Sequence, residues 1–240
     1  MGARGETLVS DARRPPGWAR QVGIVARKDV RIELATGEIV TTAGFFAVLV
    51  AVIASLAFFG GQERKSDVAP GVIWVSLAFA SVLALSRTWQ RERDDGALRG
   101  LLVSPLARSA IFAGKALGVA AFVVVVAAIV VPVTALFFSL DLGRVGLPLA
   151  LLVAAGVPGI AASGTLFGAM TIRTRARDLV LASVMLPLLT PTLLAGVAGT
   201  RALFDGASLA ELGDYLALMG VFGVVFSAGG LAMFEALLEG

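Results

Sequence analysis

The chain has 240 residues, of which 58% are hydrophobic and 15% charged, and its mean hydropathy of +0.90 is too high for a soluble domain with a polar surface. Its 20 Lys and Arg against 17 Asp and Glu leave a net charge of only +3, which gives no support to nucleic-acid binding. The absence of Cys and His excludes disulfides, thiolate metal sites and ligation of a metal or haem by imidazole. Because the apolar residues form long runs, we expect an all-α polytopic membrane protein.

The beginning of the chain differs in composition from the rest. Residues 1–22 are rich in Arg, Gly and Pro and lack the apolar core of a secretory signal, so we interpret them as a flexible basic tail. Residues 23–240 are interpreted as a single membrane domain.

Residues 18–39 combine charged and apolar residues at helical spacing, which predicts an N-terminal amphipathic helix lying at the membrane interface. Its apolar stripe comprises Trp18, Val22, Val25, Ile32 and Ile39, with Arg20, Arg27, Arg31 and Glu38 opposite. Asp29 falls inside the apolar stripe. The residues expected to hold the helix at the interface are Trp18, Arg27, Lys28 and Arg31. The alternative is an ordinary basic arm that only sets the topology.

Six apolar stretches are long enough to cross a bilayer, because a crossing helix needs about 20 mostly apolar residues. They comprise about residues 41–59, 70–86, 111–139, 146–171, 179–199 and 214–235. Sixteen of the 20 Lys and Arg fall before the first stretch, from Arg87 to Lys115, or in the fourth loop. By the positive-inside rule, these segments and both termini are expected in the cytoplasm.

The densest charge cluster, residues 87–104, lies in the second of these loops. If its first part is helical, Arg91 lies one turn from Arg87 and can pair with Asp95. Gly96 allows a turn, and the leucines that follow form an apolar underside before Pro105. We predict a short cytoplasmic coupling helix between the second and third spans, with a solvated loop of mixed charge as the alternative. The residues expected to contact a partner are Arg87, Arg91, Glu92, Arg93, Asp94, Asp95, Gly96, Leu98 and Leu101.

The six apolar cores contain no Asp, Glu, Lys or Arg; Lys115, Asp178 and Glu235 lie only at their edges, where a long side chain can extend to the interface. Ion-coupled carriers generally need an intramembrane ionisable group, so a secondary transporter is not expected. An intramembrane hydrolase is not expected either, because Ser163 has no His or carboxylate pair to act as its base.

Glycine and proline patterns mark three of the spans. The GxxxG patterns at residues 114–118 and 164–168 permit close helix contacts, either between copies of the chain or as ordinary packing. Pro187 and Pro191 lie one turn apart and each removes a backbone donor, so the fifth span is predicted to be kinked or broken there. Such a feature acts either as a pivot or as accommodated packing.

A P-loop for nucleotide binding is absent from the sequence: Gly114-Lys115 is followed by Ala116, with no Gly five residues before the pair. Several further motifs stand along the chain: RKDVRIE (27–33), PGVIWV (70–75), RERDDGAL (91–98) with GLL (100–102) and Pro105, GKA (114–116) and LPLLTP (186–191). Together they resemble the haem exporter protein B (CcmB) family over about residues 24–238. Asp94 stands where that family usually has Glu, and Arg99 where an acidic residue is frequent.

The resemblance implies a permease subunit of the ABC-2 type, multi-pass in the bacterial cytoplasmic (inner) membrane, working in cytochrome c maturation. It implies a CcmA-like ATPase and a CcmC-like haem-handling protein as partners, with CcmD- and CcmE-like proteins beside them and no nucleic acid. The chain is then not an enzyme and binds no cofactor directly: ATP binds to the partner, and the complex handles haem. The alternatives are an ABC-2 permease that exports a drug, lipid or polysaccharide, and a non-transporting membrane scaffold.

Overall fold

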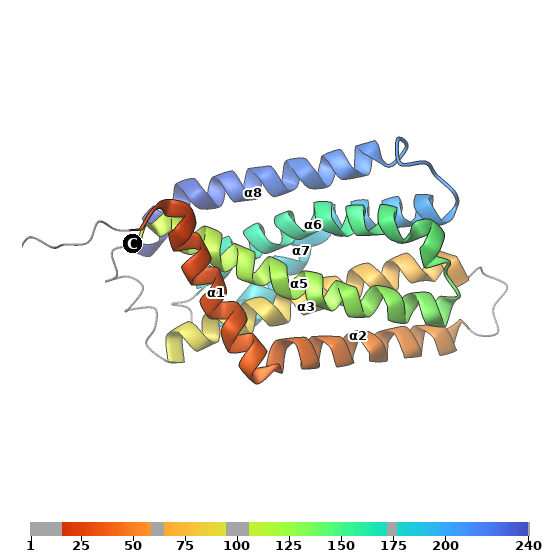
Figure 1. Cartoon of the computed structure of the whole chain (residues 1–240), viewed down its shortest axis with the longest axis horizontal. Helices are drawn as coiled ribbons and strands as arrows, with labels where there is room; N and C mark the ends of the chain where they lie inside the picture. The colour runs from red at the N-terminus through yellow and green to blue at the C-terminus, as the bar shows by residue number, and fades with distance from the viewer. Residues whose placement is uncertain (1–15, 59–64, 95–105, 172–176, 240) are drawn as a thin grey trace, which may run out of the picture.

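A computed structural model describes residues 16–58, 65–94, 106–171 and 177–239. These ranges contain helices and no strand, which confirms the all-α prediction. The helices, labelled as in Figure 1, are α1 (Trp18–Thr36), α2 (Glu38–Ala57), α3 (Lys65–Asp94), α5 (Arg108–Phe138), α6 (Leu142–Thr171), α7 (Arg177–Phe204) and α8 (Gly213–Glu239).

Six of these helices are long and apolar enough to cross a bilayer, as predicted. At a rise of about 1.5 Å per residue, 20 residues cover a hydrocarbon core of about 30 Å. The predicted ranges differ from the observed ones mainly at their ends, by up to five residues. The candidate spans are Val40–Ala57, Asp67–Ser86, Arg108–Phe138, Leu142–Met170, Ser183–Phe204 and Gly213–Phe234.

The spanning helices lie side by side, and α1 crosses one end of the bundle obliquely (Figure 1). Helix α3 packs against α2, α5, α6 and α7, and 67% of its candidate span is buried. Helix α8 lies at one edge of the bundle, and only 17% of its candidate span is buried. The bundle is therefore built around α3, while most of α8 faces outward.

Trp74 explains how α3 packs so closely on α6 and α7. Its ring lies against two glycines, Gly156 in α6 and Gly196 in α7, at positions where a Cβ would collide with the indole. The indole Nε1–H donates a hydrogen bond of 2.9 Å to Thr200 Oγ1 in α7. A large aromatic side chain is therefore accommodated because two neighbouring helices lack side chains at the contact, and its polar atom is paired in the apolar interior.

The two GxxxG patterns are contacts within this chain. A Cβ on Gly114 would lie 2.5 Å from Val25 Cβ in α1, and one on Gly118 would lie 3.4 Å from the Asp29 side chain. A Cβ on Gly164 would collide with Leu85 in α3. The glycines therefore bring α1 close to α5 and α3 close to α6. This agrees with the alternative that the patterns serve ordinary packing within one chain.

We predict that Gly114→Ala loosens the packing of α1 on α5. The added methyl group must displace the β-branched Val25 or the α1 backbone, and such overpacking costs about 1–3 kcal/mol. The matched control is Gly220→Ala in α8, where nothing lies within 4 Å of the new methyl group. Thermal unfolding in detergent should show a lower Tm for Gly114→Ala and an unchanged or higher Tm for the control; equal Tm values would contradict the prediction.

Candidate functional site

Helix α1 is hydrogen-bonded to the first turn of α5 at one end of the bundle. Trp18 Nε1–H donates to Ser109 Oγ at 3.1 Å, and the Ala107 backbone N–H donates to Gln21 Oε1 at 2.8 Å. Gln21 Nε2 in turn donates to the Pro16 carbonyl at 2.7 Å. We call these contacts and the ion pair described next the α1–α5 seam. Ala107 and Ser109 lie three and five residues after the end of the charged segment, residues 87–104, so the seam ties α1 to the start of α5, the helix that follows that segment in the sequence.

A buried ion pair lies farther along the seam. Lys115 Nζ is 3.0 Å from Asp29 Oδ2 and donates a hydrogen bond of 3.1 Å to Oδ1. Lys115 is 1% exposed and Asp29 is 7% exposed. The expectation that Lys115 extends toward the interface is therefore wrong: Gly114 and Gly118 bring α1 so close that the nearest opposite charge is the carboxylate of Asp29.

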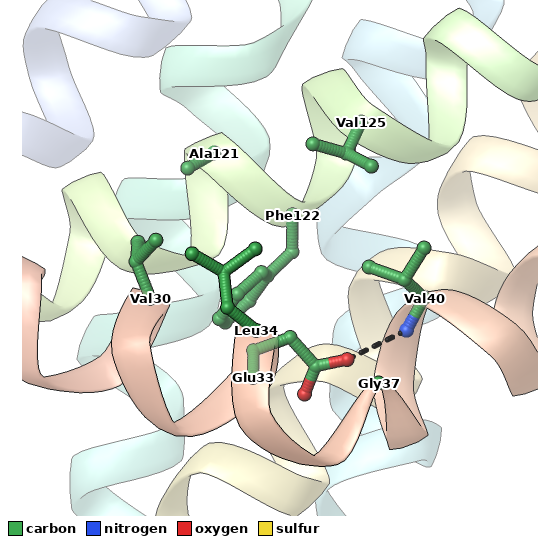
Figure 2. A pocket seen from close by; sticks show the side chains of 8 residues that line it. All are labelled: Val30, Glu33, Leu34, Gly37, Val40, Ala121, Phe122 and Val125. Atoms are coloured by element: carbon green, nitrogen blue, oxygen red, sulfur yellow. Dashed lines mark hydrogen bonds between the residues drawn. The ribbon is translucent and has the colours of Figure 1, made fainter.

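Glu33 fixes the turn between α1 and α2. Helix α1 ends at Gly37, whose φ of +64° lies in the left-handed region that favours glycine, and α2 begins at the next residue. Gly37 has no side chain to cap α2, but Glu33 Oε1 accepts the Val40 backbone N–H at 2.9 Å, as Figure 2 shows. A carboxylate at a helix N-terminus is favourable, because it pairs a backbone donor that has no partner within the helix.

The helix predicted at residues 18–39 is shorter than expected, because the turn at Gly37 places Ile39 in α2. Its predicted apolar stripe is not one surface. Val22 and Val25 are buried, whereas Trp18 and Ile32 are exposed. The buried face also contains polar side chains, since α1 packs on the start of α5 through hydrogen bonds and an ion pair. Arg27 and Arg31 are exposed and Lys28 is partly exposed. The position of α1 at the membrane interface stays a prediction.

Comparison with known proteins identifies the family. The sequence model of the CcmB protein family matches residues 20–237. The chain belongs to this family. A relative called Heme exporter protein B from Bradyrhizobium diazoefficiens is 30% identical over 75% of this chain and 81% of its own length. Proteins of the same name from Paracoccus denitrificans and Pseudomonas aeruginosa are 32% and 26% identical, over 62% and 68% of this chain and 70% and 72% of their own lengths.

In this CcmB family member, the first half of the predicted coupling segment extends a spanning helix. Helix α3 continues without interruption from its candidate span to Asp94, so Arg87, Arg91, Glu92 and Arg93 stand on the same helix as Trp74. This part of the segment is therefore not a separate short helix. Asp95, Gly96, Leu98 and Leu101 lie outside the described residues, so the predicted pairing of Arg91 with Asp95 stays a prediction.

The two prolines of the fifth span do not break it. Helix α7 runs through Pro187 and Pro191 to Phe204, so of the predicted kink or break the break is absent, and a kink or pivot at the two prolines stays a prediction. Thr190 Oγ1 donates to the Leu186 carbonyl at 3.0 Å, which is not one of the carbonyls that the prolines free. Within the described residues Thr192 Oγ1 is buried and has no hydrogen-bond partner.

The seam contains residues that the sequence analysis did not assign to the site. Asp29 and Lys115 each stand in one of the motifs that carry the likeness to the CcmB family, RKDVRIE and GKA. The sequence feature that could have indicated the pair is a single acid, Asp29, within an apolar stripe and a single cation, Lys115, between two glycines. In the described parts of the chain, no group of three or more His, Cys, Asp or Glu is placed so that it could hold a metal ion.

We predict that Lys115→Met destabilises the protein strongly, because it leaves the Asp29 carboxylate buried without its main partner. Breaking one side of a buried ion pair costs about 3–5 kcal/mol, whereas an apolar replacement of both partners is often neutral. The double variant Asp29→Leu with Lys115→Met should therefore regain most of the lost Tm in detergent. The matched control is Lys28→Met, since the Lys28 side chain is 37% exposed and its Nζ is 3.5 Å from the same carboxylate. A Tm for Lys115→Met equal to that of the control would contradict the prediction.

Proposed function

We propose that this chain is the permease subunit of an ATP-binding-cassette complex for cytochrome c maturation, which exports haem or delivers it to a periplasmic chaperone. Membership of the CcmB family and relatives named Heme exporter protein B support this function. The sequence contains no His and no Cys, the side chains that most often ligate haem iron. In this proposal haem is a cargo of the complex, and other subunits ligate it.

The position of the α1–α5 seam is the structural observation that carries the proposal. Energy from a partner has to enter this chain at its surface, because the sequence contains no P-loop. The charged segment joins α3 to α5 in the sequence, and the seam joins α1 to the first turn of α5 through Ala107 and Ser109. A force on the charged segment therefore acts on three helices at once.

The proposed mechanism is mechanical. A CcmA-like ATPase contacts residues 87–104, and its ATP-driven movement displaces them. The displacement passes along α3 and α5 through the backbone and to α1 through the hydrogen bonds and the buried ion pair of the seam. Pro187 and Pro191 weaken the hydrogen-bond ladder of α7, so this helix is where the bundle bends most easily. CcmC-, CcmD- and CcmE-like proteins receive or hold the haem beside it.

The proposed location is the bacterial cytoplasmic membrane, with both ends of the chain in the cytoplasm. Six spans return the chain to the side from which it starts, and the start of α1 lies at the same end of the bundle as the end of α8 (Figure 1). The excess of Lys and Arg in the segments at this end supports the cytoplasmic assignment. The charged segment then faces a cytoplasmic ATPase.

We predict that the triple variant Arg91→Ala, Asp94→Ala and Asp95→Ala no longer co-purifies with the partner ATPase, because these residues form the proposed contact. The matched control changes one cation and two acids at the opposite end of the bundle: Arg144→Ala, Asp205→Ala and Asp214→Ala, all exposed. Co-purification from membranes, with an unchanged Tm as the folding check, should distinguish the two variants. Normal association of the first variant would contradict the coupling mechanism.

We also predict that deletion of the gene abolishes haem staining of membrane c-type cytochromes, because their apoproteins then receive no haem. The haem-bound form of the periplasmic chaperone, assayed in the same membranes, shows whether the block lies before or after the chaperone. Restoration by the wild-type gene and by the control triple variant is the positive control. Unchanged cytochrome c levels would contradict the assignment to cytochrome c maturation and favour export of another molecule.

A further inference from the structure

A small apolar cavity lies under the C-terminal half of α1. It is bounded by α1, by the first turn of α2 and by α5, and it has a volume of about 240 Å³ (Figure 2). Glu33 is its one ionisable lining residue, and one carboxylate oxygen of Glu33 accepts the Val40 N–H. The remaining lining consists of Val30, Leu34, Gly37, Val40, Ala121, Phe122 and Val125.

The cavity opens toward the outside of the bundle, beside the candidate spans of α2 and α5. Val40 is the first residue of the candidate span of α2, and Ala121 lies within the candidate span of α5. Leu34 and Val125, on two of its walls, are 82% and 44% exposed. An apolar surface beside the spans faces lipid, so the cavity is a recess in the lipid-facing surface of the protein.

Two exposed cations flank this recess on α1. Arg27 and Arg31 each precede a lining residue, Val30 and Leu34, by three positions, so they lie beside these residues on the helix surface. Arginines at the boundary of a membrane attract anionic phosphate groups, and on the cytoplasmic side the lipids themselves are rich in anionic headgroups. Charge and apolar space are therefore arranged in the same order as the headgroup and tail of a phospholipid.

We propose that this recess binds an anionic phospholipid of the bilayer, with part of one acyl chain in the cavity and its phosphate against Arg27 and Arg31. The size fits a chain segment better than a bulky molecule, since pockets for drug-sized ligands have about 300–1,000 Å³. The bound lipid fills the space between α1, α2 and α5, next to the turn that Glu33 caps.

The experiment is native mass spectrometry of the full chain in detergent, titrated separately with phosphatidylglycerol and with phosphatidylcholine of the same acyl chains. Wild type should bind phosphatidylglycerol in preference. Ala121→Trp fills the cavity and should weaken phosphatidylglycerol binding by at least about tenfold, because the acyl methylenes lose their apolar site. Arg27→Gln with Arg31→Gln should lower the preference about tenfold by removing the two charges. The matched control is Ala128→Trp, an exposed alanine two turns along α5 that lines a separate recess against α6.

Equal binding of the two lipids by wild type would overturn the proposal. So would unchanged phosphatidylglycerol binding by Ala121→Trp, or an equal loss of phosphatidylglycerol binding in the control Ala128→Trp. If Ala121→Trp does not fold, the variant Arg27→Gln with Arg31→Gln tests the proposal by itself. Both arginines are exposed, so their replacement leaves the packing intact, and an unchanged lipid preference in that variant overturns the proposal. None of these results depends on haem transport or on the ATPase.

Discussion

The ion pair between Asp29 and Lys115 is the constraint on which the arrangement of this end of the protein depends. Both groups are buried, so separating them would leave two charges in a medium that solvates neither of them. The pair adds little stability over an apolar contact, but it penalises every position of α1 in which the carboxylate and the ammonium do not meet. We infer that it sets the register of α1 on α5, while the glycines on either side of Lys115 set the distance.

The remaining features of the site follow from this register. With Asp29 opposite Lys115, Gln21 reaches the backbone of Ala107 two turns earlier along α1, and Glu33 reaches the first turn of α2 one turn later. The spacing of these three polar side chains places one contact at the N-cap of α5, one farther along α5 and one at the start of α2. A shift of α1 along α5 by one residue would break both the Gln21–Ala107 hydrogen bond and the Asp29–Lys115 ion pair, so the seam is cooperative.

The number and extent of the spans were predictable because long apolar runs in a bilayer have few alternatives to helices. The contact partners of individual side chains were not predictable, because they depend on which helices pack against each other. In the sequence Asp29 is a single acid within an apolar stripe, and Lys115 stands at the edge of a span. Only the packing of α1 on α5 shows that the two side chains pair with each other. The sequence also left open whether the two prolines break α7, because two prolines lower the stability of an isolated helix, but they do not end one that packs against its neighbours.

The α1–α5 seam affects how force passes through the membrane domain, where most contacts between the described helices are apolar. Apolar helix packing in lipid is held by many weak contacts, over which two helices can slide at low cost. An ion pair and directed hydrogen bonds cannot slide without breaking, so displacement of α5 at Ala107 must carry α1 along with it. Because the Glu33 cap fixes the next turn, α2 follows α1. We therefore expect helices α1, α2 and α5 to move as one body.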